Sequence, residues 1–111
     1  MKLFPILSAL TVLSVSTPVL AWTVEQENIY LQATKNQLYE NGYSPTVRTD
    51  LQMLELAEST CSLQTSGGDP MRATRNHLEN LLATGTNPRI VSFVANVTFI
   101  QIANAQVYLC P

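Results

Sequence analysis

The chain has 111 residues, of which 46% are hydrophobic and 13% are charged, and its formal net charge is −2. This composition excludes a disordered polyelectrolyte, and the lack of a basic excess excludes a typical nucleic-acid-binding domain. The sequence contains only two cysteines and one histidine, so it offers few residues for metal binding or nucleophilic catalysis. Its length suits one small domain and leaves no room for a second.

Residues 1–21 have the pattern of a secretory signal peptide. Lys2 gives a positive start, residues 3–15 are largely apolar, and Val-Leu-Ala at positions 19–21 is a plausible cleavage site. An uncleaved membrane anchor is the alternative, but the apolar run is shorter than the roughly 20 residues that a spanning helix needs. We therefore expect cleavage before Trp22, a helical domain over residues 22–111, and a secreted or periplasmic location.

The two cysteines, Cys61 and Cys110, are predicted to form one intramolecular disulfide bond. An exported chain meets an oxidising compartment, and a core this small gains from a covalent link. Closing a loop of about 50 residues stabilises a fold by roughly 4 kcal/mol in the chain-entropy model. A redox role is the alternative, but it favours closely spaced thiols beside basic groups, and neither feature is present here.

The first helix is predicted to begin at Thr23, because Gln26 three residues later completes a capping-box pattern. The Asn41-Gly42 pair is typical of a helix end. The predicted buried face of this helix has seven-residue spacing and consists of Val24, Leu31 and Leu38. Aromatic side chains around the helix predict either the rim of the core or a partner surface, and they are Trp22, Tyr30, Tyr39 and Tyr43.

Ser-Pro at positions 44 and 45 predicts the start of a second helix, which ends near Gly67. Its predicted apolar face consists of Val47, Leu51, Leu54 and Cys61. Asp-Pro at positions 69 and 70 repeats this start signal, and Gly85 closes the third helix. The predicted buried face of the third helix consists of Met71, Leu78, Leu81 and Leu82.

Asn-Pro at positions 87 and 88 opens a last segment that is apolar on almost every side. One face carries Ile90, Val94, Val97, Ala105 and Tyr108. A membrane span and a β-strand are the alternatives, because residues 90–111 carry no charge and residues 97–102 are rich in β-branched and aromatic types. Amide side chains spread along the segment argue against a span, and the Asn-Pro start favours a helix. We expect this helix at the centre of a bundle.

Three short patterns resemble those of a family of exported bacterial proteins, the domain of unknown function number seven hundred and thirty-two. The family shows a Leu-x-x-x-Gly helix end, a cysteine six residues before a glycine, and a last helix ending in Tyr-Cys-Pro. The corresponding residues here are Leu38 to Gly42, Cys61 to Gly67, and Tyr108 to Pro111, where Leu109 separates the tyrosine from the cysteine. The resemblance implies a helical fold with bonded cysteines and carries no established activity.

His77 is the only histidine, and no Gly-x-Ser-x-Gly pattern accompanies it, so we expect no catalytic residues and no enzyme. It is a weak candidate for ligand binding, in which His77 with a tyrosine, Met53 or Met71 would hold haem iron or another metal. The usual alternative is a boundary histidine that packs its ring at the edge of an apolar face. No Cys/His cluster predicts a metal site, and we expect no cofactor.

Two further charged groups have plain interpretations. Glu55 and Glu58 lie one turn apart, where paired carboxylates could act on glycosides, but they are expected on the solvated face of the second helix. Arg72, Arg75 and Arg89 form the one basic cluster and are expected to be surface residues rather than a nucleic-acid site.

The sequence therefore predicts an all-α, four-helix bundle with one disulfide bond. The expected function is a non-enzymatic interaction module that binds an unknown protein or surface partner, without nucleic acid and without stable membrane insertion. The alternative is a small carrier that holds an apolar ligand, lipid or haem, between its helices. An enclosed apolar chamber would favour the carrier, whereas a filled core with an exposed apolar patch would favour the interaction module.

Overall fold

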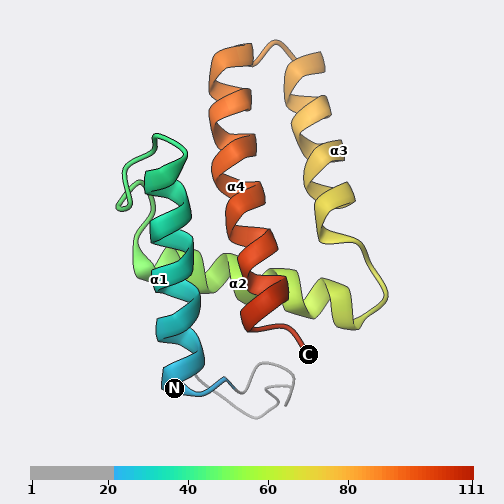
Figure 1. The fold of residues 1–111 in the computed structure, drawn as a ribbon. Helices are drawn as coiled ribbons and strands as arrows, with labels where there is room; N and C mark the ends of the chain where they lie inside the picture. Colours follow the sequence, from blue (N-terminus) through green and yellow to red (C-terminus); the bar gives the residue numbers. More distant parts are fainter. Residues whose placement is uncertain (1–21) are drawn as a thin grey trace.

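The computed structural model describes residues 22–111, and the predicted signal peptide over residues 1–21 lies outside the described residues. The described chain forms four helices and no strands: α1 (Val24–Glu40), α2 (Asp50–Thr65), α3 (Pro70–Ala83) and α4 (Pro88–Tyr108) (Figure 1). The predicted all-α class and the four-helix bundle are confirmed.

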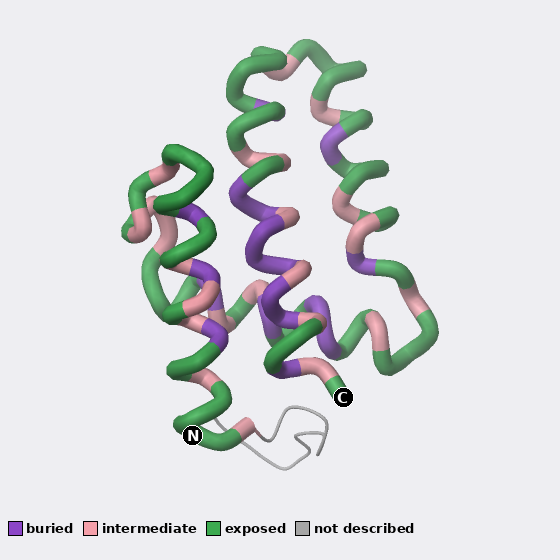
Figure 2. The backbone as a smooth tube through the Cα atoms, viewed as in Figure 1, coloured by how far each residue is buried: buried purple, intermediate pink, exposed green. Residues whose placement is uncertain are grey.

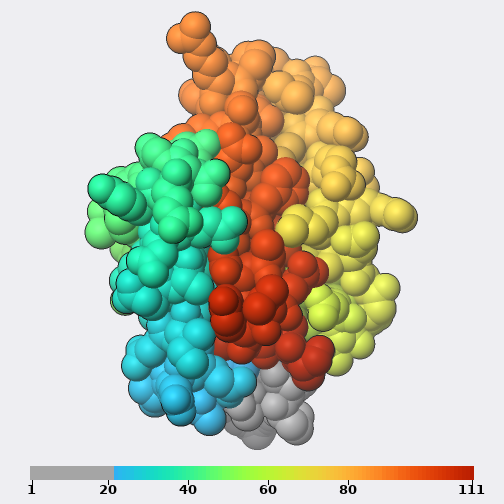
Figure 3. All heavy atoms as spheres, in the orientation of Figure 1, coloured from blue at the N-terminus to red at the C-terminus, as the bar shows by residue number. Residues whose placement is uncertain are grey.

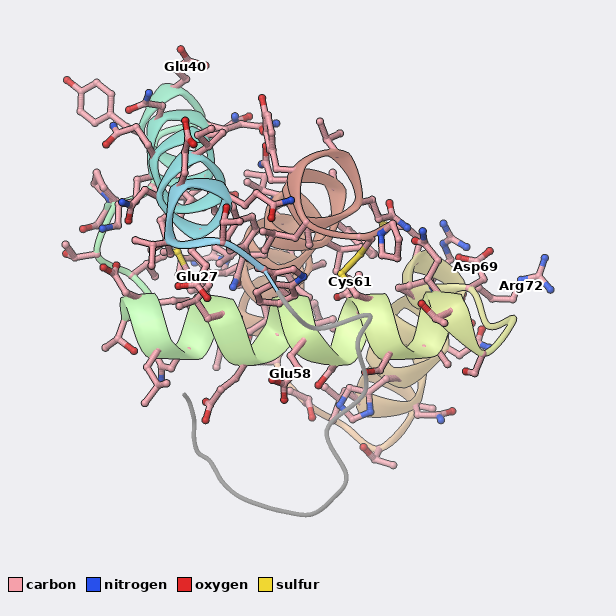
Figure 4. The ribbon with its side chains drawn as sticks, turned by 90° about the horizontal axis from the view of Figure 1, so that it is seen from below. Glu27, Glu40, Glu58, Cys61, Asp69 and Arg72 are labelled. Atoms are coloured by element: carbon pink, nitrogen blue, oxygen red, sulfur yellow. A yellow bond between two sulfur atoms is a disulfide. The ribbon has the colours of Figure 1, made fainter. Side chains whose placement is uncertain are left out.

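Helix α4 occupies the centre of the molecule, as predicted. It packs against each of the other three helices, while α1 and α3 lie on either side of it without touching each other (Figure 1). Helix α2 runs across the bundle, so that α1 and α4 are seen nearly end-on where α2 is seen from its side (Figure 4). A helix surrounded in this way can bury apolar residues on several faces, which explains the all-round apolar pattern of α4.

The helix starts agree with the sequence prediction at three of the four positions. Thr23 caps α1 through the predicted capping box with Gln26, and α3 and α4 begin at the predicted Asp-Pro and Asn-Pro pairs. Helix α2 does not begin at Ser44-Pro45. It starts after Thr49, whose side chain accepts a hydrogen bond from the Gln52 amide, while the Gln52 side chain accepts one from the Thr49 amide.

The later start of α2 has a physical reason. A reciprocal capping box satisfies two backbone donors at once, whereas the Ser44 hydroxyl accepts from one backbone amide, that of Thr46, and shares its other hydrogen bond with the Thr46 hydroxyl. Residues 44–49 are then free to form a loop against α4, and Val47 and Arg48 are half-buried in it. The prediction of a helix start at Ser44 was therefore wrong by about one and a half turns.

The buried face of α1 also differs from the predicted one. Tyr30, Thr34 and Leu38, spaced four residues apart, are fully buried, while Leu31 is half-buried and Val24 is exposed. An i, i+4 spacing follows the helical period closely, so these three side chains stand in one line facing α4. The buried face is therefore partly polar, which the search for apolar residues alone missed.

Helix α2 buries a face that the apolar pattern only partly predicted. Its buried residues are Met53, Ala57, Thr60 and Cys61. Of the predicted face, Cys61 is buried and Leu54 is half-buried, whereas Leu51 is 66% exposed. Glu55 and Glu58 are exposed, as predicted.

Helix α3 buries only Pro70 and Leu78. Met71 and Leu81 are half-buried, and Leu82, predicted to be buried, is exposed. On α4, Val97 and Ala105 are buried as predicted, while Ile90 and Tyr108 at its two ends are exposed. The buried residues of α4 gather in its C-terminal half, as the tube in Figure 2 shows.

One hydrophobic cluster forms the core, and it contains no residue of α3. Helices α1, α2 and α4 and the segment after α4 supply its members, which are Tyr30, Leu38, Met53, Ala57, Cys61, Val97, Ile100, Ala105 and Leu109. Helix α4 is long and apolar enough to cross a membrane by length and composition alone. In this fold, a third of the stretch that meets those criteria is buried against the other helices.

Candidate functional site

The predicted disulfide bond between Cys61 and Cys110 is present and joins α2 to the segment after α4 (Figure 4). The two Cα atoms are 5.0 Å apart, and Cys61 is fully buried in the core. The Cys110 amide donates to the Ala105 carbonyl at 2.8 Å, which holds the end of the chain against α4. A buried bond of this kind is structural, and it indicates an oxidising, exported location.

The weak ligand-binding candidate, His77, lies exposed on α3. Met53 is fully buried in the core formed with α1 and α4, and Met71 is half-buried at the start of α3. Among residues 22–111, no group of three or more His, Cys, Asp or Glu side chains is placed to hold a metal ion.

A polar cluster lies where the α1–α2 loop meets α4. Arg48 donates from Nη1 to Gln101 Oε1 at 2.7 Å and from Nη2 to Thr98 Oγ1 at 3.3 Å. Both acceptors are neutral, while the ion pair of the described chain joins Lys35 to Asp50 at 2.7 Å. Because a charged donor strengthens a hydrogen bond, Arg48 fastens the loop to the centre of α4.

Tyr30 extends this cluster into the core. Its hydroxyl donates to the Met53 carbonyl at 3.0 Å, which links α1 to α2. Burial raises the pKa of Tyr30 from 10.0 to about 12, while the nearby Gln101 and Thr34 side chains and the Arg48 charge act in the opposite direction. Burial therefore keeps the phenol neutral, and its hydroxyl serves as a structural hydrogen-bond donor to the Met53 carbonyl.

An open hollow lies on the outer side of α1, at its C-terminal half. It has a volume of about 310 Å³, and its lining consists of Gln32, Lys35, Asn36, Tyr39, Glu40 and Pro45. Tyr39 is 72% exposed, so most of its ring faces solvent. Within the hollow, Gln32 Nε2 donates to Asn36 Oδ1 at 2.9 Å, one turn along the helix.

A second surface feature lies at the end of the molecule where α3 turns into α4. This end projects beyond α1 (Figure 1; Figure 3). Three apolar side chains there are exposed, and we call them the tip surface: Leu82 (46%), Ile90 (56%) and Phe93 (42%). Ile90 and Phe93 stand one turn apart on the same face of α4, and Leu82 lies in the last turn of α3.

The α1–α2 loop supports one member of the tip surface. Tyr43 packs edge-on against Phe93, with ring centroids 5.5 Å apart. The Asn96 side chain in turn donates to the Tyr43 hydroxyl at 2.8 Å. An edge-to-face aromatic pair with a fixed hydroxyl is a rigid arrangement, so Phe93 is held in place rather than free to fold back onto the protein.

Comparison of the chain with models of known families, with curated proteins and with solved structures found no match. The sequence predicts the disulfide but not the contacts of Arg48 with α4, because nothing in its neighbours in sequence indicates the two acceptors about 50 positions away. It presents Tyr39 only as one of four aromatic residues around the first helix, without separating it from the buried Tyr30.

Proposed function

We propose that the protein is a non-enzymatic, exported interaction module that binds a partner protein through the tip surface. The observation that carries the proposal is the exposure of Leu82, Ile90 and Phe93 together at one projecting end. Single exposed apolar residues are ordinary on a protein surface, whereas several gathered at one end are typical of an interface. Phe93 is an aromatic anchor of the kind that interfaces favour.

The charge at this end defines the partner. Arg89 is the one charged residue in the sequence from position 80 to 111, and it directly precedes Ile90. The acidic residue nearest to this stretch in the sequence is Glu79, which is exposed on α3 one turn before Leu82. The proposal is therefore for a partner with an apolar pocket rimmed by carboxylates, in which Phe93 or Ile90 fills the pocket and Arg89 meets the rim.

The exported location agrees with this function. The disulfide indicates an oxidising compartment, and we propose that residues 1–21 act as a cleaved signal peptide that delivers the protein to the periplasm or the exterior. Membership of the domain of unknown function number seven hundred and thirty-two is part of the same proposal. We further propose that α4 stays in the bundle rather than in a membrane, since it supplies the core with Val97, Ile100 and Ala105.

The alternative of an apolar-ligand carrier receives less support. A carrier needs an enclosed apolar chamber that surrounds most of its ligand. The hollow on α1 is open and is lined largely by polar and charged side chains. We therefore propose the interaction module ahead of the carrier, because the exposed apolar residues of the tip surface support the module and this hollow gives the carrier no support.

The proposal is tested by cross-linking followed by binding measurements. The photoreactive residue p-benzoylphenylalanine is placed at position 90 in cells that export the protein, and a cross-linked partner is identified and purified. Its affinity is then measured for the wild type, for Phe93→Ser, and for Leu51→Ser as the matched control. Leu51 is 66% exposed on α2 and lies outside the tip surface, so it reports the effect of losing any exposed leucine.

We expect Phe93→Ser to weaken binding by about tenfold or more, which corresponds to at least about 1.4 kcal/mol, and Leu51→Ser to leave it unchanged. Arg89→Gln should lower the association rate and its dependence on salt. A purified partner that binds Phe93→Ser as tightly as the wild type would overturn the proposal, because the tip surface would then lie outside the interface.

A further inference from the structure

The hollow on α1 has a chemistry that differs from the tip surface and that the proposed interaction does not use. Its most unusual member is Tyr39, a large aromatic side chain that is 72% exposed in the last turn of a helix. Tyr30, two turns earlier, is fully buried and serves the core, so the exposure of Tyr39 contributes little to the fold. An exposed aromatic face inside a concave surface is available for stacking against a ligand.

The amide pair Gln32–Asn36 adds a defined set of polar groups beside this ring. One amide N–H of Gln32 is used by the carbonyl of Asn36, at 2.9 Å. Gln32 Oε1 and Asn36 Nδ2 make no hydrogen bond to any described residue, so one acceptor and one donor remain side by side. If both amides were turned over, the free atoms would be Asn36 Oδ1 and Gln32 Nε2, again one acceptor and one donor.

The charges around the hollow limit the ligand further. Lys35 Nζ is paired with Asp50 at 2.7 Å, so its charge is already compensated. Glu40 lies at the end of α1 and points away from the helix bundle, with an exposed carboxylate (Figure 4). Pro45 forms the opposite wall and offers no backbone donor. A free cation for an anionic ligand is therefore lacking in the described lining, while an aromatic ring, an amide pair and a carboxylate acceptor are present.

We propose that this hollow binds a neutral saccharide. A pyranose ring has an apolar face of C–H groups, which suits the Tyr39 ring, and neighbouring hydroxyls that each donate and accept. The free acceptor and donor of the Gln32–Asn36 pair match two such hydroxyls, and Glu40 accepts from a third. The hollow of about 310 Å³ accommodates one sugar ring and stays open at its side, so it suits one unit of a longer chain rather than an enclosed monosaccharide.

The test uses the exported, ¹⁵N-labelled protein with its disulfide intact and three neutral trisaccharides: cellotriose, maltotriose and chitotriose. Each is titrated while backbone amide shifts are recorded. We expect at least one of them to move the amides of residues 32–46 in a saturable way. Tyr39→Ala should weaken that binding by about tenfold, and Asn36→Ala by a smaller factor. Tyr108→Ala, which removes an exposed tyrosine at the far end of α4, is the matched control and should bind as the wild type does.

Tyr39 and Asn36 are both exposed, so neither substitution is expected to unfold the domain, and the dispersion of the amide spectrum checks this directly. The inference is overturned if none of the three sugars shifts residues 32–46, if the shifts lie on other helices, or if Tyr39→Ala binds equally well. Its outcome is separate from that of the proposed protein interaction, because Tyr39→Ala leaves the tip surface intact and Phe93→Ser leaves the hollow intact.

Discussion

The two ends of α4 lie in different surroundings. Its C-terminal half, with α1 and α2, belongs to the hydrophobic core and is closed by the disulfide bond. Its N-terminal half pairs with α3, and the buried apolar residues that this pair adds outside the core cluster are Pro70, Leu78 and Val91. The first region is buried from several sides, whereas the second is a helical hairpin that leaves Ile90 and Phe93 in contact with solvent.

This contrast separates the residues that stabilise the fold from the residues that we propose for binding. Nearly all the large, fully buried side chains lie in the core region, so the free energy of folding originates mainly there. The hairpin region keeps apolar side chains at the surface that the core does not need. Substitutions in the two regions should therefore differ in kind: core changes should unfold the domain, and hairpin changes should alter binding.

The largest effect is expected from the disulfide bond. Cys61→Ala with Cys110→Ala should lower the free energy of unfolding by about 4 kcal/mol, because the unfolded chain regains the freedom of a 49-residue loop. Urea unfolding with and without reductant measures this loss. Reductant should not change the free energy of unfolding of the double variant. If reductant also leaves that of the wild type unchanged, the expectation is contradicted.

Core packing comes next. Leu38→Ala should cost about 3 kcal/mol, because Leu38 is fully buried in the core cluster, and Leu78→Ala on α3 should cost less, because α3 can shift to close the space. Hydrogen exchange distinguishes the core region from the hairpin region. Leu78→Ala should lower amide protection in α3 first, while Leu38→Ala lowers it in α1, α2 and the end of α4 together. Equal loss of protection in all four helices for both variants would remove the distinction between the regions.

Because of Tyr30, the free energy of unfolding should depend on pH, by an amount similar to the cost of the core substitutions. The pKa of Tyr30 is about 12 in the folded protein, against 10.0 for a free tyrosine, so the native state holds this proton more tightly than the unfolded chain. The stabilisation is complete below pH 10 and is lost as pH rises from about 10 towards 12, by up to about 3 kcal/mol. Unfolding measured at pH 9 and pH 11 checks the fall, and Tyr30→Phe should show a smaller one.

The smallest effect is expected in the hairpin. Ile90→Ser should change the free energy of unfolding by no more than about 0.5 kcal/mol, because Ile90 is 56% exposed and lies outside the core cluster. Thermal unfolding of the wild type and of Ile90→Ser under the same conditions measures this change. A loss as large as that of Leu38→Ala would mean that Ile90 serves packing, and it would weaken the assignment of the tip surface to recognition.

Much of the architecture could be predicted because it depends on local signals. The Asp-Pro and Asn-Pro pairs, the Thr23 capping box and the all-round apolar character of α4 are readable over a few residues each. The disulfide followed from cysteine number and the predicted export. The helix caps survive in the fold because each satisfies backbone groups within a few residues, whereas the disulfide and the burial of α4 also need the helices to pack together.

The errors have two causes, which are the local capping box of Thr49 and Gln52 that the prediction overlooked and contacts between residues far apart in the sequence. The start of α2 moved to Thr49 while Arg48 in the preceding loop contacts Gln101 and Thr98, and Thr34 lies on the buried face of α1 beside the buried Tyr30. A search for apolar periodicity cannot find polar residues that are buried in a cluster. The hollow and the tip surface are equally invisible in sequence, since each joins side chains from two elements.

The disulfide also determines how the molecule responds to tension. Residues between Cys61 and Cys110, including all of α3 and α4, form a covalently closed loop. A force applied to the chain before Cys61 and after Cys110 passes through the sulfur atoms and bypasses this loop. About 170 Å of contour length is thereby protected from extension. A partner that pulls on the hairpin applies its force inside this loop, so the disulfide gives no protection against that pull.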